Sequence, residues 1–124
     1  MIRIDSLNPG VLDGVKLGEV RNLTIKGFDG EPVQMWAIYP PDFDPRKKWP
    51  LLHNIHGGPH ATWGDNFHFR WNNHVFAAQG YVVVCVNYHG SSSFGQAFKQ
   101  SPEREFGKRE FFDVADKYGD VMLE

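Results

Sequence analysis

Histidine and glycine gather in one short segment of this sequence, residues 53–60, which reads HNIHGGPH. Three interpretations are open: a metal site, a bend that needs glycine, and one half of a catalytic centre. A metal site would bring His53, His56 and His60 to one point. Strand residues three apart face opposite sides, and Gly57-Gly58-Pro59 would interrupt any helix that could align His56 with His60. We therefore expect no metal ligands here, and nothing in the sequence calls for a cofactor.

The two glycines fit an oxyanion hole. They follow an apolar stretch that predicts a strand over residues 50–55. Glycines at the end of a buried strand let the backbone turn sharply and leave its N–H groups unshielded at the carboxyl end of a sheet. Such donors stabilise the negative charge that develops on a carbonyl oxygen during acyl transfer, which is the role of the HGG element in esterases and related hydrolases. A glycine turn without chemistry is the alternative.

The elements around this segment predict an α/β fold. Residues 19–39 alternate between apolar and polar and indicate a β-hairpin with its turn at Asp29-Gly30. Apolar residues recur at helical spacing between residues 66 and 79, where Trp71, Val75, Phe76 and Ala78 would share a face, and the β-branched run at 81–87 predicts a buried strand. Strand, helix and strand at this spacing form a parallel βαβ unit.

The last part of the chain predicts two helices. Ser101-Pro102-Glu103 is typical of a helix start. From residue 111 to 124 one helical face is apolar, with Asp113 on the opposite, polar face. The apolar face comprises Phe111, Val114, Ala115, Tyr118, Val121 and Met122. Nothing downstream packs on it, so we expect an incomplete domain, with residues 1–18 as a lead-in and residues 19–124 as the N-terminal portion of a hydrolase domain.

Composition excludes several classes of function. The 124 residues carry 13 Lys and Arg against 15 Asp and Glu, for a net charge of -2, so we expect no nucleic-acid partner. No apolar run approaches the roughly 20 residues that a membrane span needs. The single cysteine, Cys85, lies in the apolar strand and is expected to pack in the core, while His68 and His74 are expected to be partly exposed or hydrogen-bonded. The compartment, cytoplasm or periplasm, stays open.

Three ordered motifs resemble the catalytic domain of the prolyl oligopeptidase family of serine peptidases, in its acylaminoacyl-peptidase and dipeptidyl-peptidase branch. They are residues 56–60 (HGGPH), residues 76–83 (FAAQGYVV) and residues 87–98 (NYHGSSSFGQAF). The resemblance covers residues 19–124 and implies an α/β-hydrolase domain that carries Ser, Asp and His, usually beside a β-propeller that restricts entry to short peptides. Residues 1–18 resemble the segment that joins the two domains.

The resemblance also implies roles for individual residues. Gly57 or Gly58, and preferentially Gly58, would offer a backbone N–H to the oxyanion. Residues 87–90 would form a wall beside it, and many relatives have Arg in place of His89. Contacts with a short peptide substrate would come from His56, Pro59, His60, Asn87 and Tyr88.

The catalytic triad itself is missing. A nucleophile elbow needs Gly-x-Ser-x-Gly, but Ser92 is followed two residues later by Phe94, and Ser93 is preceded two residues earlier by Ser91. In relatives the nucleophile comes after the last predicted helix, so we expect this chain alone to be inactive. Two alternatives stay open: a noncatalytic half-domain that binds a partner or itself through its open sheet edge, and part of an esterase for small acyl esters.

Overall fold

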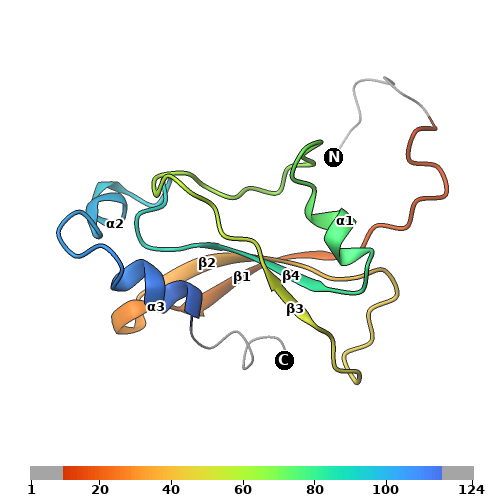
Figure 1. The fold of residues 1–124 in the computed structure, drawn as a ribbon, viewed down its shortest axis with the longest axis horizontal. Helices are drawn as coiled ribbons and strands as arrows, with labels where there is room; N and C mark the ends of the chain where they lie inside the picture. Colours follow the sequence, from red (N-terminus) through yellow and green to blue (C-terminus); the bar gives the residue numbers. More distant parts are fainter. Residues whose placement is uncertain (1–9, 116–124) are drawn as a thin grey trace.

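The computed structural model describes residues 10–115, which form a mixed α/β architecture around one four-stranded sheet (Figure 1). In chain order the elements are β1 (Val20–Lys26), the 3-10 turn η1 (Phe28–Gly30), β2 (Pro32–Ile38), β3 (Leu51–His53), α1 (Asn73–Ala77), β4 (Val82–Asn87), α2 (Gln96–Gln100) and α3 (Arg109–Ala115). None of the helices in this part of the chain is long and apolar enough to cross a bilayer.

The sheet has the order β1-β2-β4-β3. β1 and β2 pair antiparallel, and their turn places Asp29 and Gly30 at φ values of 54° and 80°, so the predicted hairpin and its turn are confirmed. β3 and β4 pair in parallel with α1 between them in sequence, which confirms the βαβ unit. β2 joins the two halves by pairing antiparallel with β4.

β4 is buried on both faces of the sheet, as its β-branched run predicts. Val82, Val84 and Val86 point into one core cluster, to which α2 and α3 contribute Phe98 and Val114. Val83 and Cys85 point into the other cluster, which α1 covers with Phe76 and Ala77. Cys85 is fully buried, and burial raises the pKa of its thiol to about 12, so it acts as a core residue.

The helix predicted over residues 66–79 is much shorter in the structure. It begins at Asn73 because the Asn72 side chain accepts a hydrogen bond from the His74 N–H at 3.0 Å, which caps the first turn. The preceding segment is irregular, and the His68 ring accepts hydrogen bonds from two backbone N–H groups there. Of the four apolar residues predicted for this helix only Phe76 packs against the core, since Trp71, Val75 and Ala78 are exposed and Ala77 points inward instead.

Two predictions for the last part of the chain were wrong. Ser101 does not begin a helix: it follows α2, and its hydroxyl donates to the Phe98 carbonyl at 2.7 Å. On α3 the expected faces hold only for Val114, which packs against the core, because Asp113 is 1% exposed while Phe111 is 64% exposed. Asp113 is buried because it receives hydrogen bonds from two other parts of the chain, described below. The predicted helical face at Tyr118, Val121 and Met122 lies outside the described residues.

Candidate functional site

The glycine loop, residues 56–63, leaves β3 at its carboxyl end. The Asn54 N–H still pairs with the Val84 carbonyl at 2.9 Å, and the backbone turns away directly afterwards. Gly58 has a φ of 128°, and a Cβ atom at this position would lie 2.8 Å from the His60 backbone nitrogen and 3.0 Å from that of Ala61. A Cβ atom at Gly57 would meet nothing within 4 Å. Glycine is therefore required at position 58 and not at position 57.

The loop leaves two backbone donors unpaired. Gly57 and Gly58 are both exposed, and no acceptor among residues 10–115 takes the N–H of either residue. Adjacent backbone N–H groups at the carboxyl end of a parallel strand can bind an anion or a carbonyl oxygen that gains negative charge.

The glycine loop is fastened to the support segment, residues 87–92, which follows β4. The Tyr88 hydroxyl donates to the His56 carbonyl at 2.6 Å, and the two rings stack with centroids 4.4 Å apart. The Gly90 carbonyl lies 2.8 Å from His60 Nδ1. Ser92 donates to the Ala61 carbonyl through its N–H and to the His60 carbonyl through its hydroxyl. These bonds hold the loop at several points along its length.

Asn87 fixes the far end of the glycine loop. Its carbonyl oxygen accepts the Trp63 N–H at 2.7 Å, and its amide donates to the Trp63 carbonyl at 3.0 Å and to the Gln34 side chain. The Asn87 side chain thus pairs with the Trp63 backbone as a neighbouring strand would. Because Asn87 is fully buried, each of these groups would be costly to leave unpaired.

All residues predicted for the site lie together. His56, Pro59 and His60 belong to the glycine loop, while Asn87 and Tyr88 are buried beneath it and hold it in place. Contacts of these five residues with a peptide stay predictions. The structure adds a role that the sequence did not reveal for Asn87 and Tyr88, which is to support the loop.

His56 and Ser91 are not a nucleophile and its base, although His56 Nε2 lies 2.9 Å from the Ser91 hydroxyl. Ser91 is fully buried, so a substrate carbonyl cannot reach its oxygen. His56 Nδ1 faces the Gly57 carbonyl and not a carboxylate, and burial lowers the pKa of the ring against a smaller opposing effect of that carbonyl. The pair joins the glycine loop to the support segment.

A buried charged cluster lies behind the support segment, and the sequence reasoning missed it. His89 Nδ1 is 2.6 Å from Asp113 Oδ2, and His89 Nε2 is 2.6 Å from Glu31 Oε2. The three residues are far apart in the sequence, so no local spacing reveals them. The one available signal was the family resemblance, which implies arginine, another cation, at this position in many relatives.

No metal site is evident: between residues 10 and 115, no group of three His, Cys, Asp or Glu side chains is placed to hold a metal ion. His53, the first histidine of the segment, is half-buried, and burial lowers the pKa of its ring despite a backbone hydrogen bond to Val114.

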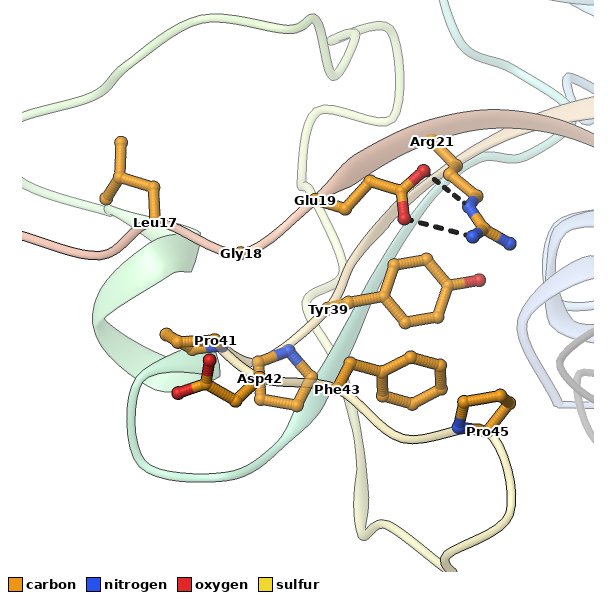
Figure 2. A pocket seen from close by; sticks show the side chains of 10 residues that line it. Leu17, Gly18, Glu19, Arg21, Tyr39, Pro41, Asp42, Phe43 and Pro45 are labelled. Atoms are coloured by element: carbon orange, nitrogen blue, oxygen red, sulfur yellow. Dashed lines mark hydrogen bonds and ion pairs between the residues drawn. The ribbon is translucent and has the colours of Figure 1, made fainter.

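A cavity of about 400 Å³ lies at the opposite end of the sheet, where β1 begins and β2 ends (Figure 2). The Arg21 guanidinium pairs with Glu19 at 2.8 Å and lies 4.9 Å above the centre of the Tyr39 ring. Tyr39 in turn packs on Phe43. The third charged residue of the lining, Asp42, pairs with Lys16 at 3.2 Å. The charged groups of the cavity are therefore already paired, and it is not the candidate site.

Comparison with known proteins identifies the family. The sequence model of the prolyl oligopeptidase family matches residues 67–118. The chain is 46% identical over 82 residues to dipeptidyl-peptidase 5 of Aspergillus oryzae, and 32% identical over 110 residues to dipeptidyl-peptidase 4 of Giardia intestinalis. These alignments cover 66% and 89% of this chain. The chain belongs to the prolyl oligopeptidase family of serine peptidases.

Solved structures of this family share the fold. Acylaminoacyl peptidase of Pyrococcus horikoshii matches 91% of this chain with a TM-score of 0.78 and 26% identity. Dipeptidyl peptidase 4 of Porphyromonas gingivalis matches 70% with a TM-score of 0.61 and 28% identity. The chain spans only a small part of these family members, namely 11% and 14% of the two sequence relatives and 18% and 12% of the two solved chains.

Proposed function

We propose that this chain is the N-terminal part of a serine peptidase domain and supplies one wall of its oxyanion hole. The observation that carries the proposal is the glycine loop, whose two unpaired N–H groups follow β3 and are held by hydrogen bonds to the support segment. Membership of the prolyl oligopeptidase family supports a role for those donors in peptide hydrolysis, where they would stabilise the oxyanion. The resemblance favours Gly58 as the principal donor.

In the complete enzyme, a serine outside this chain would attack the peptide carbonyl and pass its proton to a histidine. The carbonyl oxygen would become negative and accept the Gly58 N–H. Collapse of the intermediate would release the amine with that proton, and water would then hydrolyse the acyl-enzyme. Loss of one oxyanion donor typically costs about 100- to 1000-fold in turnover.

The loop is suited to this role because it is preorganised. Its hydrogen bonds run to buried groups of the support segment, so the donors need little rearrangement when charge develops. The residues of the site would contact a short peptide substrate, which agrees with the similarity of this chain to peptidases. No metal or cofactor takes part in this proposal.

The incomplete domain is the second part of the proposal. A cavity of about 250 Å³ next to the loop is lined mostly by apolar groups, including Ile55, Pro59, Phe111 and Val114. In a complete hydrolase domain, further strands would cover this face. Residues 1–18 would then be the lead-in, and residues 19–124 the first portion of that domain.

A serine-directed fluorophosphonate tests the proposal. The 124-residue chain should not be labelled, because Ser91 is buried and no serine in the sequence lies in a nucleophile elbow. Labelling at Ser92 or Ser93 would contradict the assignment. The source transcript should also continue past Glu124 in an open frame to a Gly-x-Ser-x-Gly motif, and that longer product should be labelled.

A noncatalytic module is the second candidate, and the same exposed apolar face favours it. A stop codon directly after Glu124 would support a half-domain that uses this face to bind a partner or a second copy. An esterase for small acyl esters would share the glycine loop and would be distinguished by the substrates of the longer product.

A further inference from the structure

The His89 ring is enclosed by charged and aromatic groups from three parts of the chain. Asp113 approaches from α3 and Glu31 from the residue between η1 and β2, each at 2.6 Å. The Phe98 ring of α2 stacks on the imidazole with centroids 4.5 Å apart and carries no charge. The His89 and Asp113 side chains are fully buried, whereas Glu31 is half-exposed.

The geometry requires a proton on both ring nitrogens. Ionised carboxylates only accept hydrogen bonds, and each nitrogen of His89 faces a carboxylate oxygen. A neutral imidazole has one donor, so one of its nitrogens would turn a lone pair toward a carboxylate oxygen. The arrangement is therefore made for an imidazolium between two acids.

The electrostatics agree with the geometry. Burial alone would lower the pKa of His89, but the hydrogen bonds and charges of Asp113 and Glu31 outweigh burial and raise the pKa above its ordinary value of 6.5. The stabilisation from this ion cluster is then complete below pH 6.5 and is lost as the pH rises through the raised pKa.

The cluster is linked directly to the glycine loop. The His89 N–H donates to Asp113 at 2.7 Å, and the next three residues, Gly90, Ser91 and Ser92, each bond to the glycine loop. Asp113 also accepts the Phe28 N–H at 2.8 Å, so the same carboxylate ties α3 to the hairpin turn.

We propose that His89 is a positioning residue, held as an imidazolium by Asp113 and Glu31, whose deprotonation shifts the support segment and with it the Gly57 and Gly58 donors. The consequence for catalysis rests on the proposed function, whereas the coupling is a property of this chain. His89 thereby sets an upper pH limit on the oxyanion wall.

NMR of the isotope-labelled chain tests the coupling. The ring signals of His89 should titrate with a midpoint above 6.5, and the amide signals of Gly58 and Gly90 should shift with the same midpoint. Asp113→Asn removes an acid in contact with the ring and should lower both midpoints together by about 1 pH unit or more. His89→Arg keeps the charge without titrating, so the fold should remain and this amide titration should vanish.

A second test variant and a control variant complete the experiment. If Asp113→Asn fails to fold, Glu31→Gln on the half-exposed side of the cluster should lower the same two midpoints. Glu103→Gln alters an exposed acid outside the cluster and should leave the midpoints of the His89 ring signals and of the amide signals unchanged.

A His89 titration midpoint at or below pH 6.5 would contradict the charged state of the ring. If His89 titrates above pH 6.5 but the amide signals of Gly58 and Gly90 do not shift with it, the coupling is contradicted. The NMR titration tests the coupling alone, whereas fluorophosphonate labelling tests the peptidase assignment, so the failure of one proposal can be distinguished from the failure of the other.

Discussion

Gly57 and Gly58 are adjacent, yet a methyl group has different consequences at the two positions. At Gly58 the φ of 128° disfavours any side chain, and the Cβ atom would collide with the His60 backbone nitrogen. Gly58→Ala should therefore lower the free energy of unfolding by roughly 1–3 kcal/mol, the usual cost of such backbone strain. Urea denaturation of the purified chain measures this change.

Gly57→Ala is the matched control, since the added methyl group would enter open space. It should change the free energy of unfolding by less than about 0.5 kcal/mol. Equal losses from the two variants would mean that the loop does not have the conformation described here.

At the residue scale, the sequence was informative where chemistry depends on neighbouring residues. The HGG spacing predicted a sharp backbone turn after an apolar strand, and the chain turns there with Gly58 at a φ of 128°. The oxyanion role of this turn stays a prediction. The support from Asn87 and the His89, Asp113 and Glu31 cluster could not be predicted. Those contacts join residues 24 to 58 positions apart, and only the folded chain brings them together.

At the scale of elements, the sheet depends on β2, because this strand pairs with β1 on one side and with β4 on the other. Met35 of β2 is fully buried in the larger core cluster. Met35→Ala should cost roughly 2–5 kcal/mol of unfolding free energy, because it leaves a cavity that the sheet cannot close. Met35→Leu keeps the volume and should cost less than about 1.5 kcal/mol.

Thermal or urea unfolding monitored by circular dichroism distinguishes the two Met35 variants. Similar stabilities for Met35→Ala and Met35→Leu would show that the β2 core tolerates a void. The described packing of Met35 would then not contribute to stability as proposed.

Strands were easier to predict than helices for a physical reason. Alternation in β1 and β2 and the apolar run of β4 arise from the burial of whole faces, which the sequence displays directly. The start of α1 depends on a single hydrogen bond, which the Asn72 side chain accepts from the His74 N–H, and the burial of Asp113 on α3 depends on distant partners. Periodicity carries no information on either.

At the scale of the molecule, the glycine loop and the neighbouring face beside β3 differ in how well their groups are covered. Buried hydrogen bonds from the support segment hold the glycine loop and leave only the Gly57 and Gly58 N–H groups open, whereas the face beside β3 exposes Leu51, Ile55 and Phe111. β3 is an edge strand of three residues with parallel pairing on one side. An apolar face next to an open strand edge favours association with another chain segment.

The 124-residue chain should therefore self-associate through this face, and Phe111 offers the sharpest test. Phe111→Glu places a charge in the apolar cavity beside the loop and should weaken association at least about tenfold, since a buried Phe contributes roughly 1.5–3 kcal/mol. Phe69→Glu is the control, because Phe69 is 95% exposed and does not line this cavity. Sedimentation velocity over a concentration series should show a shift to monomer for Phe111→Glu alone. If the parent chain is already a compact monomer at all concentrations, the face needs no partner, and the proposal of an incomplete domain loses its main structural support.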